Sequence, residues 1–262
     1  MGRSRTLSAN WYDYPQYYDI AFQAYTRREA DFIEAACRKY CSFGVRRLME
    51  PACGSGRLIT EFAARGYQVT GFDVSQPALS YLRRRLKRRG LRAQTFEAEM
   101  SDFRLGRPVD AAYCTVGTFR HLLTEDAARS HLECIARTLR PGGIYILGSH
   151  LLALGGGKGN SDCWTERRGE TKVTITQRVL RIDIRSRIEN LRVCLLARRG
   201  STELRLRYEF QFRTYTARQF RRLLDSIPSL ELCDIYDFRY DVTRPLAPND
   251  GMAYTVFVLR RL

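Results

Sequence analysis

No uninterrupted apolar run approaches the roughly 20 residues that a membrane-spanning helix needs. The first part of the chain changes from Arg3 and Arg5 to polar and aromatic residues between Ser8 and Tyr18, which is not the pattern of a signal peptide. We therefore expect a cytoplasmic location. With 262 residues, of which 44% are hydrophobic and 27% charged, the chain can form one large domain or one domain with an elaboration.

The eight cysteines include no C-x-x-C pair. Cys37 and Cys41 are one helical turn apart, but zinc needs about four convergent ligands. We therefore expect reduced thiols and no metal site.

Lysine is scarce: it provides only four of the 44 basic residues, although the formal net charge is +16. Clustered arginines neutralise phosphates, so this charge is compatible with a nucleic-acid partner. The arginines are scattered, however, over the segments 83–89, 178–192 and 218–222. A compositional preference for arginine also explains the charge, so a nucleic-acid partner is possible but not favoured.

Short apolar runs alternate with helical patterns along much of the chain. The periodicity predicts one or two helices between Tyr12 and Cys41, then helices at about 56–65, 76–89, 124–139 and 216–226. Strands are predicted at 45–49, 68–72, 93–98, 109–114, 144–147, 230–238 and 254–259. This alternation predicts an α/β fold: a Rossmann-like, seven-stranded, mostly parallel sheet with helices on both faces.

One segment departs from this alternation. Leu204, Leu206, Tyr208, Phe210 and Phe212 occupy every second position, with polar residues between them, and rougher patterns of the same kind precede them. Such a pattern indicates antiparallel strands with one covered face. The predicted organisation is a helical lead-in or lid over 1–43, a ligand-binding domain over 44–155 and 216–262, and an antiparallel insertion over 156–215, which would be an acceptor lid or an oligomer contact.

A glycine-rich turn joins the first predicted strand to the next helix. Gly54 and Gly56 follow a strand that ends in Glu50, and glycine lets a backbone approach a ligand closely and adopt positive φ. Asp73 ends the next predicted strand, where a carboxylate can accept hydrogen bonds from both ribose hydroxyls. A dinucleotide turn would carry a third glycine where this chain has Ile59. Glu50 would repel a pyrophosphate but suits a cationic amine or sulfonium.

Five segments, in this order, resemble the motifs of the class I S-adenosylmethionine-dependent methyltransferases, with a likeness to small-molecule enzymes. They are Glu50–Arg57, Thr70–Ser75, Glu99–Phe103, Asp110–Cys114 and Leu139–Gly143, the last being the loop before the fifth strand of the sheet. The resemblance covers about residues 45–150. It implies S-adenosylmethionine as cofactor, S-adenosylhomocysteine as product, and methyl transfer to a small-molecule nitrogen or oxygen.

The resemblance also implies a set of cofactor contacts. Gly54 and Gly56 would pass under the methionine part, Asp73 would bind the ribose, and Val74 would touch the adenine. Glu99 and Met100 would contact the adenine amine and ring, Thr115 and Val116 would line the methionine end, and an N-terminal tyrosine would close the site. The complete set comprises Tyr12, Tyr18, Glu50, Ala52, Gly54, Gly56, Arg57, Asp73, Val74, Glu99, Met100, Thr115 and Val116.

The acceptor is harder to infer from the sequence. Methyl transfer is an in-line displacement that needs little acid or base chemistry, and His121 and His150, after the fourth and fifth predicted strands, are the candidates for any proton transfer. The expected protein is a monomer or homodimer with no membrane partner. An RNA methyltransferase and a non-catalytic cofactor-binding protein are the alternatives.

Overall fold

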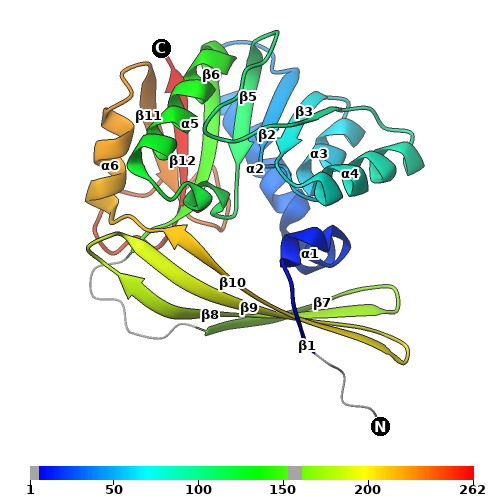
Figure 1. The fold of residues 1–262 in the computed structure, drawn as a ribbon. Coiled ribbons are helices and arrows are strands. Elements are labelled where there is room, and N and C mark those ends of the chain that lie inside the picture. The colour runs from blue at the N-terminus through cyan, green and yellow to red at the C-terminus, as the bar shows by residue number, and fades with distance from the viewer. Residues whose placement is uncertain (1–5, 153–160) are drawn as a thin grey trace.

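The structure is a computed structural model that describes residues 6–152 and 161–262, and it confirms the predicted α/β fold. Its main sheet has the strand order β11-β12-β6-β5-β2-β3-β4 (Figure 1). Only β12 runs antiparallel to its neighbours. The strands are β2 (Arg47–Pro51), β3 (Gln68–Asp73), β4 (Gln94–Glu97), β5 (Val109–Cys114), β6 (Leu139–His150), β11 (Leu230–Tyr236) and β12 (Tyr254–Arg261).

Helices cover both faces of this sheet. One face packs against α2 (Thr26–Tyr40), α3 (Arg57–Ala64) and α4 (Gln76–Arg88), and the other against α5 (Glu125–Thr138) and α6 (Ala217–Asp225). Strand β5 shows why a layer of helices forms on each face. Ala111 and Tyr113 pack in the core beside α2, α3 and α4, while Ala112 and Cys114 pack in the core beside α5 and α6. Strands with two buried faces are typical of parallel sheets.

Side-chain caps determine where three of the helices begin. Ser75 Oγ accepts from the Ala78 N–H at the start of α4, and Thr124 Oγ1 accepts from the Ala127 N–H at the start of α5. At α6, Thr216 and Gln219 form a reciprocal capping box. These bonds satisfy backbone N–H groups that a helix leaves unpaired in its first turn.

A second sheet of five strands lies across one end of the first sheet (Figure 1). It contains β7 (Ser161–Arg168), β8 (Thr171–Asp183), β9 (Ile188–Arg199) and β10 (Thr202–Arg213), all antiparallel. Its fifth strand is β1 (Thr6–Ser8), which pairs in parallel with β10. Residues 6–8 were expected in the helical lead-in, and that expectation is wrong for them, because the free edge of β10, rather than a local pattern, makes them a strand.

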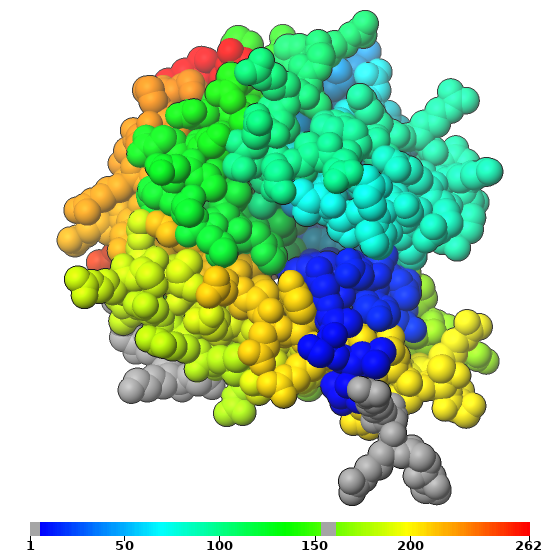
Figure 2. Space-filling view, in the orientation of Figure 1, coloured from blue at the N-terminus to red at the C-terminus, as the bar shows by residue number. Residues whose placement is uncertain are grey.

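Residues 11–25 are mostly helical and lie between the two sheets (Figures 1 and 2). It consists of η1 (Trp11–Asp13), α1 (Pro15–Phe22) and η2 (Gln23–Tyr25), which lead into α2. Trp11, Ile20 and Ala21 are buried on the inner face of the second sheet, against residues such as Val193 and Leu195. This segment therefore belongs to the core between the sheets.

Strand β6 begins earlier than expected. The segment 139–143 was expected to be a loop, but β6 already pairs at Leu139 with Val109 and again at Ile144 with Ala111. The unequal spacing between these two pairs is an irregularity inside the strand, where Gly142 adopts φ +75°. Across residues 6–152 and 161–262, no helix is both long and apolar enough to cross a membrane.

Candidate functional site

A cavity of about 330 Å³ lies at the carboxyl ends of β2, β3 and β5. Chain order reverses at β2, whose neighbours are β3 on one side and β5 on the other, and ligands of open α/β sheets bind at such switch points. The structure brings together all of the predicted site residues here except two. Those in the wall are Tyr12, Tyr18, Glu50, Ala52, Gly54, Arg57, Asp73, Val74, Glu99, Met100, Thr115, Val116 and His121.

A larger and more open groove of about 870 Å³ lies at the opposite ends of the same strands, beside Arg47, Arg92 and Arg107. It contains none of the predicted site residues. We take the smaller cavity as the candidate site, because it is the one at the switch point and it gathers the buried polar groups described below.

The glycine-rich turn forms one wall of the cavity, and Asp73 holds it in place. The Gly54 N–H donates to Asp73 Oδ2 at 2.7 Å, and the Ser75 N–H donates to Asp73 Oδ1 at 2.8 Å. Burial raises the pKa of Asp73, while these backbone donors act in the opposite direction. A carboxylate has about four lone-pair sites, so Asp73 can still accept bonds from a ligand.

Two non-glycine residues in the wall have left-handed backbone conformations. Ala52, in the turn, has φ +50°, and Val116, after β5, has φ +59°. Such a conformation costs a non-glycine residue about 1–2 kcal/mol and is rarest for β-branched side chains. Backbone strain of this kind collects at functional sites, which is consistent with a ligand-binding role for this end of the sheet.

Buried charges lie beneath the turn. Arg57 Nη2 donates to Glu29 Oε2 at 2.7 Å, and Thr115 Oγ1 donates to the same oxygen at 2.7 Å. Glu29 Oε1, Glu50 Oε2 and Arg57 Nη1 are also buried, and none of the described residues provides them with a hydrogen-bond partner. An unpaired buried polar group costs about 1–3 kcal/mol, so these atoms mark a place where a polar ligand would be stabilising.

The electrostatics of this cluster favour a bound cation. Burial raises the pKa of Glu50 well above its usual range, although Arg57 opposes the shift. Burial alone would lower the pKa of Arg57, but the adjacent Glu29 carboxylate outweighs it and the pKa lies above its usual range. Arg57 therefore stays charged, and Glu50 would ionise more readily beside a cationic group.

The other end of the cavity is aromatic. The Tyr12 hydroxyl lies 2.9 Å from Nε2 of His121, and the two rings meet edge to face. Phe210 stacks on His121 and Phe212 meets it edge on, with ring centroids 5.8 and 4.7 Å away, and both come from β10 of the second sheet. Burial and the nearby Arg120 lower the pKa of His121 to about 4, so its ring is neutral at pH 7. Burial also raises the pKa of Tyr12, which keeps its hydroxyl protonated.

A third part of the cavity lies between the ends of β3 and β4. Val74 is 53% exposed although it is apolar, and Met100 is buried beside it in the wall. The Glu99 side chain is exposed. An apolar slot with one polar edge suits a flat heterocycle.

Comparison with known proteins agrees with this geometry. Residues 49–143, the segment that contributes the turn, Asp73 and Thr115, match the family model described as a methyltransferase domain. This segment is a methyltransferase domain.

Sequence relatives match only part of the chain. A dTDP-3-amino-3,4,6-trideoxy-alpha-D-glucopyranose N,N-dimethyltransferase of Streptomyces venezuelae is 28% identical over 100 residues, which are 38% of this chain and 40% of that protein. The chain matches half or less of the length of such curated relatives.

Solved structures resemble almost the whole chain, including the part outside the methyltransferase domain. An S-adenosylmethionine-dependent methyltransferase from Clostridium acetobutylicum has a TM-score of 0.76 at 17% identity, over 96% of this chain and 99% of that one. A SAM-bound amino pentose methyltransferase from Micromonospora echinaspora has a TM-score of 0.69 at 20% identity, over 98% and 99%. At these identities the likeness shows the fold.

Two predicted residues of the site lie outside the cavity wall. Gly56, at the start of α3, has φ +68°, and a Cβ there would meet Leu82 Cδ1 of α4 at 2.1 Å, so this glycine allows two helices of the methyltransferase domain to pack. His150 packs against Phe238 and Tyr254 at the end of β6. Burial and Arg120 lower its pKa to about 4.

Sequence reasoning missed several residues around the site. Glu29, on α2, is fully buried under the methyltransferase domain, and Asp19, on α1, is fully buried beside the turn. Glu29 gave a signal, because it lies four residues before Ile33 on the apolar stripe of its helix, where a carboxylate needs a buried partner. The alternating pattern of β10 was recognised, but nothing local indicated that Tyr208, Phe210 and Phe212 would face the cavity.

Proposed function

We propose that the chain binds S-adenosylmethionine in the 330 Å³ cavity and transfers its methyl group to an amine on a small molecule. The observation that carries this proposal is the pair of buried atoms without a described partner, Oε2 of Glu50 and Nη1 of Arg57, in the wall of one cavity. The methionine end of the cofactor carries an ammonium and a carboxylate. Glu50 would accept from the ammonium, and Arg57 would donate to the carboxylate.

The rest of the wall fits the remaining parts of the same molecule. Asp73 would accept from the ribose hydroxyls while it keeps its two backbone donors. Val74 and Met100 would enclose the adenine ring, with Glu99 at the polar edge of the ring. The Gly54 backbone would lie against the ligand, because its φ of +52° and its missing side chain keep the turn open.

Acceptor chemistry would take place at the aromatic end. When bound, the cofactor supplies an electrophilic methyl group on a sulfonium. The protein's task is then to hold the acceptor in line and exclude water, which Phe210, Phe212 and the Tyr12–His121 pair are placed to do. His121, with a pKa of about 4, is too weak a base to hold a proton at neutral pH. We infer that the pair orients the acceptor through a hydrogen bond, and that water takes up the proton from the methylated product.

An amine on a sugar or a similar small molecule is the acceptor class that the relatives suggest. The Streptomyces venezuelae relative is named as an N,N-dimethyltransferase of an amino sugar nucleotide, and the Micromonospora structure as an amino pentose methyltransferase. In the same proposal, the N-terminal segment acts as the lid and the second sheet as the acceptor wall, because Tyr12 and Phe210 contribute to the cavity from those two parts.

Calorimetry with S-adenosylmethionine and S-adenosylhomocysteine tests the cofactor. Gly54→Ala has a matched control in Gly169→Ala, since both glycines have similar positive φ and open space where a Cβ would go, yet only Gly54 lines the cavity. Both variants should lose similar stability, and only Gly54→Ala and Asp73→Ala should lose cofactor affinity. Equal affinities in Gly54→Ala and Gly169→Ala would contradict the proposed placement, and failure of the unmodified protein to bind would end the proposal.

Transfer of a radiolabelled methyl group tests the acceptor class. Label should enter a pool of small amines, amino sugars among them, and not total RNA. Label in RNA would instead favour an RNA methyltransferase that uses the arginine-rich surface. Cofactor binding without any transfer to either pool would favour a non-catalytic cofactor-binding protein.

A further inference from the structure

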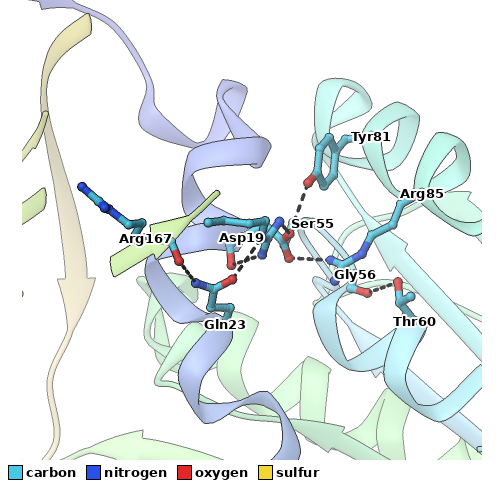
Figure 3. Close-up of polar contacts among 9 residues, drawn as sticks. Asp19, Gln23, Ser55, Gly56, Thr60, Tyr81, Arg85 and Arg167 are labelled. Carbon is cyan, nitrogen blue, oxygen red and sulfur yellow. Dashed lines mark hydrogen bonds and ion pairs between the residues drawn. The ribbon is translucent and has the colours of Figure 1, made fainter. Parts of the chain in front are cut away.

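A buried carboxylate outside the cavity wall ties together three parts of the molecule (Figure 3). Asp19 lies on α1 with no exposed surface. Its Oδ1 accepts from Arg85 Nη1 of α4 at 2.5 Å, and its Oδ2 accepts from Arg168 Nη1 of β7 at 2.6 Å. One carboxylate therefore joins the N-terminal segment, the methyltransferase domain and the second sheet. We call Asp19, Arg85 and Arg168 the Asp19 clasp.

Weaker bonds extend the clasp to the glycine-rich turn and to α4. Ser55 Oγ, in the turn, lies 3.4 Å from Asp19 Oδ1, and Tyr81 of α4 donates its hydroxyl to Asp19 Oδ2 at 3.2 Å (Figure 3). Ser55 is itself in the cavity wall. Any movement of α1 away from α4 would therefore disturb the turn that is proposed to lie under the cofactor.

The clasp also fixes the orientation of α1 on the second sheet. Arg168 donates to the Asp19 backbone carbonyl at 3.2 Å and to Gln23 Oε1 at 2.9 Å. Gln23 donates back to the Arg167 carbonyl at 2.8 Å (Figure 3), and Trp164 donates to the Ala21 carbonyl at 3.0 Å. These bonds attach the end of α1, and the residue that follows it, to strand β7.

Tyr18 links the orientation of α1 to the cavity. It immediately precedes Asp19, and it lines the cavity together with Pro15 at the start of the same helix. Burial raises the pKa of Tyr18 to about 12, so its hydroxyl is protonated where it faces the cavity. Adjacent positions of one short helix thus carry the cavity wall and the clasp, and an eight-residue helix has little of its own stability to hold them in place.

We propose that Asp19 is a positioning residue that couples the closed arrangement of α1 and the second sheet to cofactor binding. The inference rests on the proposed function. Entry of the cofactor beneath Tyr18 requires α1 to lift, and the two ion pairs of the clasp set how much of the time the helix is closed. A protein that is less often closed binds its ligand more weakly in proportion to that fraction.

Arg168 is the residue for the test, because within the described residues its side chain bonds only to Asp19 of α1 and to Gln23, the first residue of η2, and it does not line the cavity. Its side chain is 40% exposed, so water can solvate what a substitution leaves behind and the protein should still fold. Arg167 is the matched control: it is the neighbouring residue on β7, it is exposed, and within the described residues only its backbone takes part in a hydrogen bond.

Affinity for S-adenosylhomocysteine, measured by calorimetry, should fall about five- to tenfold in Arg168→Gln and at least tenfold in Asp19→Asn, with Arg167→Gln within twofold of the unmodified protein. Arg168→Lys, which keeps the charge, should recover part of the loss. The double variant Asp19→Asn, Arg168→Gln should bind no more weakly than Asp19→Asn alone, because the second change removes an interaction that is already lost.

Stopped-flow measurements should place the change in the dissociation rate, which a merely structural loss of stability would not move. Equal affinities in Arg168→Gln and Arg167→Gln, or additive losses in the double variant, would overturn the inference and leave the proposed function untouched. Failure of the unmodified protein to bind S-adenosylmethionine or S-adenosylhomocysteine would instead contradict the proposed function itself.

Discussion

Glu50 and Arg57 face the same cavity, each with a buried polar atom that no described residue satisfies, while Arg57 also forms an ion pair with Glu29 at 2.7 Å. The guanidinium thus has one side paired with the protein and one side free. Glu50 has no such partner for its Oε2. Glu29 also has an unsatisfied oxygen, Oε1, but its other oxygen is paired with Arg57 and it lies outside the cavity wall, whereas Glu50 lies in the wall. We therefore propose that Glu29 supports the fold and that Glu50 contacts the ligand.

Glu50→Gln should stabilise the protein without its cofactor and weaken cofactor binding. Burial raises the folded-state pKa of Glu50, so the folded protein holds this proton more tightly than the unfolded chain. Ionising Glu50 therefore costs stability, and the cost grows as pH rises from the ordinary carboxyl range through the raised pKa. The amide removes that cost, but it also removes a charge-assisted bond of about 1.5–3 kcal/mol, or about 10- to 100-fold in affinity.

Thermal unfolding at pH 7 and calorimetry with S-adenosylmethionine measure these two effects. Glu29→Gln is the comparison, and it should destabilise the protein, because it leaves Arg57 buried without its ion-pair partner. A loss of stability in both variants would show that Glu50 is structural like Glu29.

Tyr12→Phe and His121→Asn should each lower kcat/KM by about 10- to 100-fold, as expected when a positioning hydrogen bond is lost. Their effects should not add, because the Tyr12 hydroxyl and His121 Nε2 contact each other at 2.9 Å. With a His121 pKa of about 4, the rate should show no inflection from this residue between pH 5 and 8. An inflection near pH 6.5 that His121→Asn abolishes would make His121 a general base.

His121 should also make the protein sensitive to acid. Its folded-state pKa of about 4 lies below the ordinary value of 6.5, so between these values the unfolded chain binds a proton that the folded protein does not. The free energy of unfolding therefore falls as pH decreases from 6.5 to 4, with a slope of up to about 1.4 kcal/mol per pH unit from this group. Urea unfolding measures this free energy, and its dependence on pH between 4 and 6.5 should be weaker in His121→Asn than in the unmodified protein. The same pH dependence in both proteins would show that His121 is not a buried, neutral ring.

Ala52→Gly should stabilise the protein by about 0.5–1 kcal/mol, because glycine adopts the observed φ of +50° without the penalty that alanine meets. Cofactor affinity should remain within about threefold, since the turn keeps its conformation. Ala35→Gly, in the interior of helix α2, is the control with the opposite expected effect, and it should lose about 0.5–1 kcal/mol. Urea unfolding measures both, and destabilisation by Ala52→Gly would mean that this backbone carries no strain.

Gly56→Ala should destabilise the protein by about 1–3 kcal/mol, the usual cost of overpacking. The added methyl would meet the Leu82 side chain, which is fully buried between α3 and α4. Leu82→Ala should recover part of that loss in the double variant, because it opens the space that the methyl needs. Since Gly56 lies outside the cavity wall, the folded fraction should bind cofactor normally, and a loss of affinity at equal stability would place Gly56 in the site after all.

Much of the main fold could be predicted because its signals are local. Ser75, Thr124 and the Thr216–Gln219 box begin helices α4, α5 and α6 through contacts within four residues. The glycine-rich turn and Asp73 were recognisable from their spacing, and the hydrogen bond between them at 2.7 Å shows that the two segments meet in the fold. Local alternation also predicted β8, β9 and β10 of the second sheet, because one face of each strand is covered, but it located neither β1 nor β7.

The sequence by itself determined the alternation of strands and helices, the position of the turn and the residues at the ends of β2, β3 and β5, because periodicity, capping and glycine conformations depend on neighbouring residues. Only the tertiary structure decided what closes the cavity. Asp19 and Arg168 are 149 positions apart, and Tyr12 and His121 are 109 apart. Pairings at such distances depend on how α1 and the second sheet pack over the end of the first, and no local pattern encodes that packing.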